Sequence, residues 1–383
     1  MHHMLKLNDI QENVLQRAMR FSDELLAPEA AERDRQESFA DEHLKAMGRA
    51  GLLGVNISQN YGGLNAGVVA YAVAVRALAQ GCAGTTVAMM VTNMVAEAIE
   101  KFGSEEHKQK YLGALCSGQW PAAGFCLSEP GSGSDAASMR ATALKEEKND
   151  GYLYRLNGTK AWVTSGGEAG VYLVTAKTNP QAGSRGVSAF LIEANTDGFR
   201  AAPPEKKVGL RTSKTTQMIL EDCLLPPKQL LGEEGKGFSV MMNALDGGRI
   251  GVSAQAIGVA DAALKLMLRQ YDLRADEELG RLITQSQAER DAAWLLCLRA
   301  ASLKDQGKPL TQQASMSKVY CTEMANRVCQ RAVRGLGALG HQASCEAERL
   351  LRDVRVMRIY EGTSEIQRFV IAREELKKMR ATR

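Results

Sequence analysis

A carboxylate near the C-terminus of this chain lies where a helix would not need one. The segment RIYEGTSEIQR runs from Arg358 to Arg368. Ser364 and Gln367 have the spacing of a capping box, which predicts that the last helix begins there. Glu361 precedes that cap, so the preference for acidic residues in a first helical turn does not explain it. A carboxylate outside the helix could instead accept a proton.

A second segment with chemical potential is FCLSEPGSGSDA, residues 125–136. Gly131, Gly133 and Ala136 satisfy the glycine spacing of a dinucleotide-binding turn. That turn should open a crossover helix, whereas the sequence that follows runs quickly into a hairpin signal. We therefore favour a tight glycine turn between strands. Its backbone N–H groups and serine hydroxyls could still bind an anion or the polar edge of a ring.

Trp162 and Thr164 in KAWVTSGG should lie on one side of a strand, because side chains alternate with a period of two. A tryptophan at such a position is most often a core residue. Paired with the serine-rich loop earlier in the chain, it could also form one face of a site for a flat heteroaromatic cofactor.

The segment LDGGRIG places Asp246 and Arg249 three residues apart on one helical face. The simplest interpretation is a surface ion pair that contributes little to stability. Gly247 and Gly248 between them each weaken a helix by roughly 1 kcal/mol relative to alanine. Two such glycines indicate that another group approaches the helix closely.

Three zones of the chain must position these residues. Residues 1–118 show helical periodicity, residues 119–228 contain short β-branched and aromatic runs, and residues 229–383 return to long helical patterns. Asn157-Gly158 predicts a hairpin turn inside an antiparallel sheet domain. The C-terminal helical patterns are too long for ordinary surface helices and predict a packed bundle.

The composition excludes several classes of protein. A net charge of +4 over 383 residues gives no reason to expect a nucleic-acid partner. The eight cysteines form no C-x-x-C pair, so we expect buried thiols in a reducing compartment and no metal site. The start of the chain shows no secretory leader, and the apolar run from Thr85 to Ile99 is too short and polar to span a bilayer. We therefore expect a cytoplasmic protein.

Six motifs together resemble the acyl-CoA dehydrogenase family over nearly the whole chain. They are YGGLNAG, LSEPGSGSD, NGTKAWVTSG, KVGLRTSKTTQMILEDC, LDGGRIG and IYEGTSEIQR, in the family's order and spacing. The resemblance implies an N-terminal helical domain, a central antiparallel β-barrel-like domain and a C-terminal four-helix bundle. It also implies FAD as cofactor, a homotetramer with FAD at the subunit interfaces, and an electron-transferring flavoprotein as electron acceptor.

The resemblance assigns roles by position. It implies FAD contacts for one set of residues: Phe125, Leu127, Ser128, Gly133, Ser134, Trp162, Val163, Thr164, Gln287, Arg334, Gly337, Thr363, Ser364 and Glu365. It implies contacts with the acyl-CoA substrate for a second set: Ser134, Ser184, Asp246, Arg249 and Gly362.

By the same resemblance Glu361 is the catalytic base, which removes the proton α to the thioester carbonyl. Some family members carry the base on the helix of the Asp-x-x-Arg motif instead, and that position here is Gly248, which cannot serve. The implied reaction converts an acyl-CoA to trans-2-enoyl-CoA, with the β-hydride passing to flavin N5. The placement of the base favours the short- or medium-chain and short-branched members.

Two segments depart from the family pattern at residues that should contact FAD from a neighbouring subunit. The arginine and phenylalanine of R-x-x-F-G-x-P are replaced by Asp276 and Leu279, and Arg274 lies two residues upstream. In RGLGALG, Arg334 replaces a family glutamine. We hypothesise that Arg334 pairs with the FAD pyrophosphate across the interface. The alternative is that FAD binding is weakened or rearranged.

Other functions share these motifs. One alternative keeps the fold but uses an acyl-carrier-protein substrate, or acts as an atypical acyl-CoA lyase or reductase. Another, motivated by Asp276 and Arg334, is a flavin-poor protein that binds thioesters without turning them over.

Overall fold

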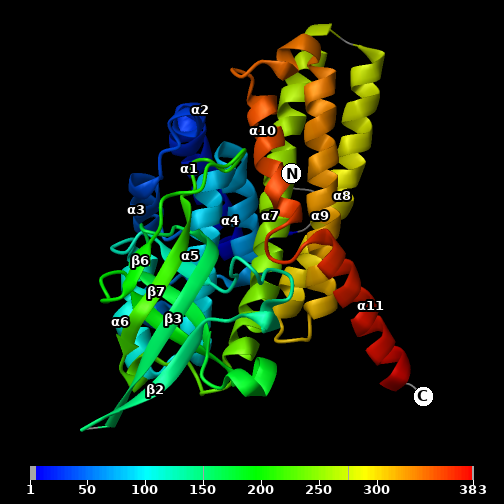
Figure 1. Ribbon diagram of the computed structural model, residues 1–383. Helices are drawn as coiled ribbons and strands as arrows, with labels where there is room; N and C mark the ends of the chain where they lie inside the picture. Colours follow the sequence, from blue (N-terminus) through cyan, green and yellow to red (C-terminus); the bar gives the residue numbers. More distant parts are fainter. Residues whose placement is uncertain (1–5, 150, 275, 382–383) are drawn as a thin grey trace.

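The computed structural model describes residues 6–149, 151–274 and 276–381. The chain begins with a group of helices (Figure 1) whose bounds are α1 Asp9–Phe21, α2 Ala27–Gln36, α3 Asp41–Arg49, α4 Gly67–Gly81, α5 Ala83–Phe102 and α6 Glu105–Ser117. A capping box formed by Asn8 and Gln11 starts α1. Almost every residue of α4 and most of α5 are buried, as expected for helices that are apolar all round.

A curled sheet follows, with strands β1 Ala123–Cys126, β2 Thr142–Lys148, β3 Gly151–Thr164, β4 Val171–Lys177, β5 Val187–Glu193, β6 Phe199–Ala201 and β7 Thr215–Leu225. The strand order is β1-β4-β2-β3-β7-β6, and β5 also pairs with β4. The expected antiparallel pairing holds for β2–β3, β3–β7, β4–β5 and β6–β7. The pairing of β1 with β4 is parallel, so the sheet is mixed.

The predicted hairpin at Asn157-Gly158 is wrong. Both residues lie inside β3, and the register against β7 shifts between Leu156 and Gly158, which marks a β-bulge. Gly158 has φ +147, and a Cβ at this position would lie 2.6 Å from the Cβ of Ala141. Asn157 exchanges hydrogen bonds with Asp222 of β7, since its Oδ1 accepts from the Asp222 N–H at 2.8 Å. The residue types that favour a turn serve here to bend a long strand.

The C-terminal helices are α7 Gly237–Arg274, α8 Glu277–Asp305, α9 Thr311–Gly335, α10 Glu346–Val354 and α11 Ser364–Ala381. The predicted bundle is confirmed: α7, α8 and α9 pack side by side with the shorter α10, while α11 contacts α9 and then points away (Figure 1). By length and composition α7 could cross a membrane. However, 89% of its most apolar window is buried inside the molecule, which is typical of a core helix.

A buried ionic cluster joins the N-terminal helices to the bundle. Arg76 of α4 donates through Nε to Asp261 of α7 at 2.6 Å, and its guanidinium lies 4.6 Å from the ring centroid of Trp294 on α8. Arg290 of α8 pairs with the same carboxylate at 2.5 Å. Since removing one partner of a buried ion pair costs about 3–5 kcal/mol, this cluster fixes how α4 sits on the bundle.

The bulge in β3 yields a prediction about stability. We expect Gly158→Ala to lower the free energy of unfolding by about 1–3 kcal/mol from backbone strain alone, with the clash against Ala141 adding to it. Gly113→Ala is the matched control, because a Cβ at this site in α6 meets nothing within 4 Å. This control should gain about 0.5–1 kcal/mol. Chemical denaturation measures both, and equal stabilities for the two variants would contradict the assigned register.

Candidate active site

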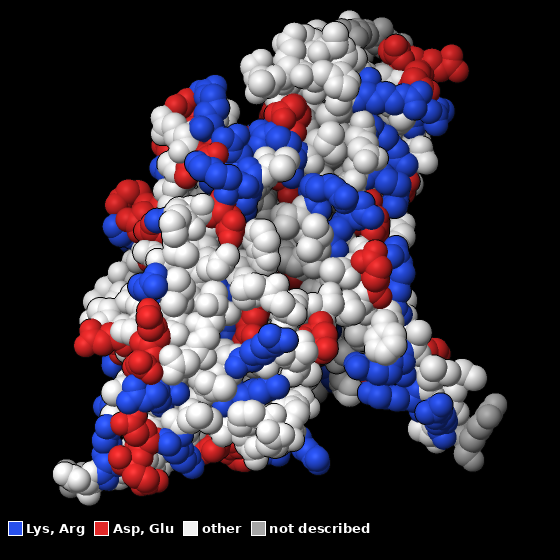
Figure 2. All heavy atoms as spheres, viewed as in Figure 1, with Lys and Arg blue, Asp and Glu red and all other residues white. Residues whose placement is uncertain are grey.

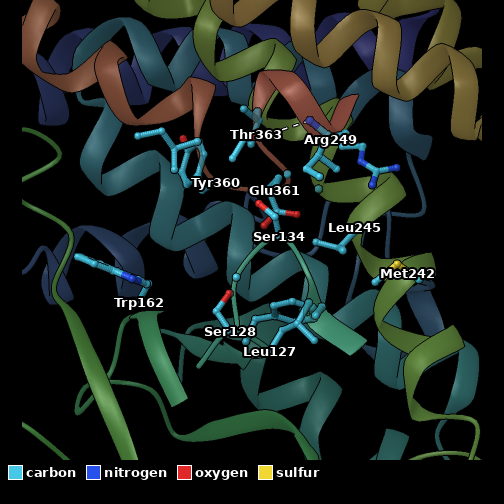
Figure 3. Close-up of a pocket in the computed structure, with 18 of the residues that line it drawn as sticks. Leu127, Ser128, Ser134, Trp162, Met242, Leu245, Arg249, Tyr360, Glu361 and Thr363 are labelled. Atoms are coloured by element: carbon cyan, nitrogen blue, oxygen red, sulfur yellow. Dashed lines mark hydrogen bonds between the residues drawn. The ribbon is translucent and has the colours of Figure 1, made fainter. Parts of the chain in front are cut away.

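A cavity of about 1540 Å³ lies where the three parts of the chain meet. Its walls come from α5, from the loop after β1, from the end of β3, from α7 and from the turn between α10 and α11. In Figure 3 the Glu361 carboxylate points into this cavity toward Ser134, while Met242 and Leu245 of α7 face it from the side.

The turn that carries Glu361 has an unusual backbone. Glu361 and Gly362 both have positive φ, +55 and +93. For a residue with a side chain this conformation costs roughly 1–2 kcal/mol, so the surroundings must hold it. The side-chain amide of Gln367 donates to the carbonyl oxygens of Glu361 and Gly362, each at 3.0 Å, and Lys318 Nζ donates to the Gly362 carbonyl at 2.7 Å.

The predicted capping box at Ser364 and Gln367 is wrong by one residue. Thr363 caps α11, because its hydroxyl accepts from the backbone N–H of Ile366 at 3.3 Å. Ser364 is already helical, and its hydroxyl donates to Glu323 of α9 at 2.8 Å. Gln367 is free to turn back toward the two carbonyls of the Glu361 turn. The residues assigned to helix initiation therefore also shape the site.

Desolvation dominates the electrostatics of Glu361. The side chain lies against the cavity, and burial raises its pKa to about 7, opposed by the positive charges of Arg249 and Lys318. Its Oε2 atom is buried and accepts no hydrogen bond from the described residues. The backbone N–H of Glu361 also lacks an acceptor within those residues. A carboxylate in this state is suited to take a proton near neutral pH.

Gly248 on α7 makes room for that carboxylate. A Cβ at Gly248 would lie 2.9 Å from the Cδ atom of Glu361 and 3.1 Å from the sulfur of Met94. A Cβ at the neighbouring Gly247 would instead meet the Lys304 ammonium at 2.5 Å, on a different side of the helix. The close approach that the two glycines indicated is therefore present at both positions, with a different group at each.

Asp246 and Arg249 do not form the surface ion pair of the simplest interpretation. Their side chains pair at 2.6 Å and both are largely buried. The second carboxylate oxygen of Asp246 accepts from the hydroxyl of Thr311 at 2.7 Å. Arg249 Nε is buried and has no hydrogen-bond partner among the residues described. The pair is a charged part of the cavity wall, because helix packing closes over it.

The opposite wall carries an exposed tryptophan. Trp162 is 64% exposed and has φ +59, at a bulge where the register of β3 against β7 shifts between Lys160 and Val163. As predicted, Trp162 and Thr164 share a side, and both line the cavity, whereas Val163 is fully buried beneath them. The hydroxyls of Ser128, Ser134 and Thr164 make no hydrogen bond to any described residue. An open aromatic face beside free hydroxyls fits a planar ring system such as the flavin of FAD.

The serine-rich loop is the tight turn favoured over a dinucleotide-binding turn. Glu129 and Ser132 exchange backbone hydrogen bonds at 2.9 and 3.1 Å. Lys160 Nζ, which is fully buried, donates to the Glu129 carboxylate at 2.9 Å and to the Leu127 carbonyl at 3.2 Å. The Ala161 N–H donates to the Ser128 carbonyl at 2.8 Å. These contacts hold the loop and the Trp162 bulge together as one wall.

The cavity gathers most of the residues that the sequence singled out: Phe125, Leu127, Ser128, Gly133, Ser134, Trp162, Thr164, Ser184, Asp246, Arg249, Glu361, Gly362 and Thr363. Val163 and Ser364 are buried next to it, and Glu365 points to solvent. Gln287, Arg334 and Gly337 do not line it. Arg334 lies about 35 Å along α9 from Thr311, a cavity residue, at 1.5 Å per helical residue. The side chain of Arg274 lies outside the described residues.

Sequence reasoning missed Lys318 and Gln367. Lys318 is fully buried on α9, where Ala314 and Cys321 lie on the same helical face and are also buried. A lysine in line with small and apolar residues at helical spacing was the available signal. Gln367 was assigned to a cap and so received no second role.

Basic side chains surround the mouth of the cavity. Figure 2 shows Lys and Arg gathered on the face between α2 and α10. The cavity lining includes Lys206, Lys207, Arg352 and Arg355 on this side, and Arg185 and Lys236 from the sheet domain and the start of the bundle. Such a rim complements a ligand that carries phosphate groups.

Comparison with known proteins identifies the family to which these three domains belong. Three family models match the chain: the acyl-CoA dehydrogenase N-terminal domain at residues 8–119, the middle domain at residues 124–223 and the C-terminal domain at residues 235–376. The chain is 37% identical to the mitochondrial short-chain specific acyl-CoA dehydrogenase of Rattus norvegicus, covering 99% of this chain and 93% of that protein.

Two further similarities bear on function. The chain is 38% identical to an acryloyl-CoA reductase (NADH) of Anaerotignum propionicum, covering 96% of this chain and 95% of the relative. The solved structure of butyryl-CoA dehydrogenase from Megasphaera elsdenii superposes with a TM-score of 0.93 at 35% identity, covering 97% of this chain and 99% of that one.

Proposed function

This chain belongs to the acyl-CoA dehydrogenase family, and from that premise we propose that Glu361 is the base of its reaction. The protein is an oxidoreductase that carries out FAD-dependent dehydrogenation of an acyl-CoA. The observation that supports Glu361 is its unpaired carboxylate oxygen in the cavity, with burial raising its pKa to about 7.

In the proposed mechanism the acyl thioester lies between the Trp162 wall and Glu361. The Glu361 carboxylate removes the proton from the carbon α to the thioester carbonyl. Its own backbone N–H, which is free of other acceptors, donates to the carbonyl oxygen and stabilises the negative charge that develops there. The apolar side chains of Met90, Val91 and Met94 exclude water from the acyl group.

FAD, when bound, supplies the acceptor for the hydride that leaves the β-carbon. Trp162 and Thr164, together with Leu127, Ser128 and Ser134 of the same wall, would hold its ring. The basic rim would bind the phosphate groups of FAD and of CoA. Thr363, Ser364 and Glu365 are further proposed FAD contacts at the start of α11.

We propose a short acyl chain as substrate, because the relatives named above act on short-chain acyl-CoA or butyryl-CoA. We also propose an electron-transferring flavoprotein as acceptor, a homotetrameric assembly and a cytoplasmic location, all of which remain predictions from the sequence.

The reductase among the relatives favours a second candidate, reduction of a 2-enoyl-CoA at the same site. Two assays separate these candidates. Oxidation of butyryl-CoA with an artificial electron acceptor measures dehydrogenation, and reduction of crotonyl-CoA with NADH measures the reverse direction.

The first prediction from this proposed function tests the base. We expect Glu361→Gln to lose about 10²- to 10⁴-fold in turnover of butyryl-CoA while keeping its FAD, since the amide cannot take a proton. Because the carboxylate must be ionised to act, wild-type turnover should rise with pH through about 7. Reduction of the bound flavin by substrate, followed in a stopped-flow spectrometer, measures both effects. Full turnover in the glutamine variant would exclude the mechanism.

Stability provides an independent check of the same titration. The folded-state pKa of Glu361 is raised, so the protonated form stabilises the fold at low pH and this contribution is lost as pH rises through about 7. Relative to Glu361→Gln, the wild type should therefore become less stable between pH 4.5 and 8. A difference in unfolding free energy that does not change with pH would contradict the raised pKa.

The second prediction concerns Gly248. We expect Gly248→Ala to reduce turnover by about 10²-fold, because the methyl group displaces the Glu361 carboxylate, and misplacing a catalytic group by about 1 Å has effects of this size. Gly247→Ala is the matched control: its methyl group meets the flexible end of Lys304, which can move. Both variants gain helix propensity, so both should keep or raise their thermal midpoint. Equal turnover in the two would contradict the steric argument.

The third prediction concerns Arg334, which we propose contacts the FAD pyrophosphate of a neighbouring subunit. Gln287 and Gly337 are further proposed FAD contacts. The Arg334 guanidinium is 70% exposed and pairs with Glu278 at 2.9 Å, so a second chain can reach it. We expect Arg334→Gln to weaken FAD binding and to reduce its dependence on salt. Arg281→Gln is the control, since Arg281 pairs with the same Glu278 at 2.8 Å. Identical FAD affinity in the wild type, Arg334→Gln and Arg281→Gln would refute the contact between Arg334 and the FAD pyrophosphate.

A further inference from the structure

Lys318 of α9 lies against the Glu361 turn but is not part of the cavity lining. Its side chain is fully buried, and within the described part of the chain its ammonium makes one hydrogen bond, to the Gly362 carbonyl at 2.7 Å. No described carboxylate lies within ion-pair distance of it. Burying an ammonium with so little compensation is costly, and an apolar side chain of similar length would avoid that cost. The presence of lysine at this position therefore calls for a role that an apolar residue could not fill.

The hydrogen bond from Lys318 restrains the part of the turn that has positive φ angles, Glu361 and Gly362. The Gly362 carbonyl accepts from Lys318 and from the Gln367 amide, while the Glu361 carbonyl accepts from Gln367 alone. Together these donors fix the peptide groups on both sides of Gly362. That restraint holds Glu361 at φ +55, the conformation in which its carboxylate reaches the pocket beside Gly248. Without it, the turn could relax toward ordinary backbone angles and withdraw the carboxylate.

The charge of Lys318 acts on the same carboxylate. The charged and titratable groups around Glu361 are Arg249 on α7, Lys318 on α9, Tyr71 on α4 and the adjacent Tyr360. Those around Lys318 are Glu361, Arg249, and the more distant Glu323 and Glu365. Burial lowers the pKa of Lys318 to about 7, and Glu361 opposes that shift. In return the ammonium lowers the pKa of Glu361, so that losing it would raise that pKa further.

We propose that Lys318 is a positioning residue for the reaction: it pins the Glu361–Gly362 turn through the Gly362 carbonyl and provides a counter-charge for the ionised Glu361. This inference rests on the proposed function, in which Glu361 is the base. Arg249 alone cannot substitute, because its charge is already shared with Asp246 at 2.6 Å and, among the described residues, it makes no hydrogen bond to the turn.

The test compares Lys318→Met, which removes both the donor and the charge, with Lys318→Arg, which keeps both. We expect Lys318→Met to lower kcat for butyryl-CoA at pH 7 by about 10- to 100-fold with KM little changed, since the base is misplaced rather than the substrate unbound. The acid limb of its pH profile should move up by about one pH unit. Lys318→Arg should recover part of the rate and return the limb toward the wild-type position.

Stability and matched controls separate positioning from a general structural role. Replacing a buried charge by methionine should leave the thermal midpoint unchanged or raised, and FAD content intact. Lys265→Met removes an exposed lysine from α7 and should leave rate and pH profile unchanged. A lower thermal midpoint with an unshifted acid limb in Lys318→Met would overturn the proposal. So would a wild-type rate and profile in that variant while Glu361→Gln is inactive. If Glu361→Gln itself turns over normally, the base assignment fails instead.

Discussion

The structure around the cavity is organised by one constraint: a carboxylate must be kept away from water and still be able to ionise. Desolvation raises the pKa of Glu361, and two cations, Arg249 and Lys318, limit that rise. Neither cation forms a direct ion pair with Glu361. A direct ion pair would keep the carboxylate charged and would occupy the oxygen atoms that accept a proton. The pKa of Glu361 therefore depends on the distances from its carboxylate to Arg249 and Lys318, and the packing of α7 and α9 fixes those distances.

The two walls of the cavity come from segments far apart in the chain, and each is rigid for its own reason. The wall that carries Trp162 is joined by Lys160, whose fully buried ammonium connects the loop after β1 with the bulge of β3. The acid-bearing wall depends on α7, which the cluster of Arg76, Asp261 and Arg290 fixes against α4 and α8. Contacts within the sheet domain therefore shape the first wall, whereas an ionic cluster between the N-terminal helices and the bundle fixes the second.

Much of this could be read from the sequence. The order of helical, β and helical regions was predictable because the periods of hydrophobic residues differ between them. The motifs located Glu361, Trp162 and the serine-rich loop. Local turn signals were less reliable: Asn157-Gly158 has the residue types of a hairpin turn but lies in a bulge, since pairing with β7 on one side and β2 on the other keeps β3 continuous. The burial of Asp246 and Arg249 depends on which helices pack against them, and no local pattern contains that information. For Lys318 the spacing of buried residues on α9 could indicate burial, but not the contact with the Gly362 carbonyl.

The space beside Gly248 also limits how such a chain could change over time. The family offers two positions for the acidic residue, which correspond here to Glu361 and Gly248. In this molecule the side chain of Glu361 fills the space beside Gly248. A glutamate introduced at position 248 would collide with Glu361 before it could replace it. With Glu361 as the proposed base, its loss alone would leave the site without a base. Relocating the acid therefore requires both positions to change together, and each single step is worse than the starting point. The steric exclusion at Gly248 therefore makes the two positions of the carboxylate mutually exclusive in this fold.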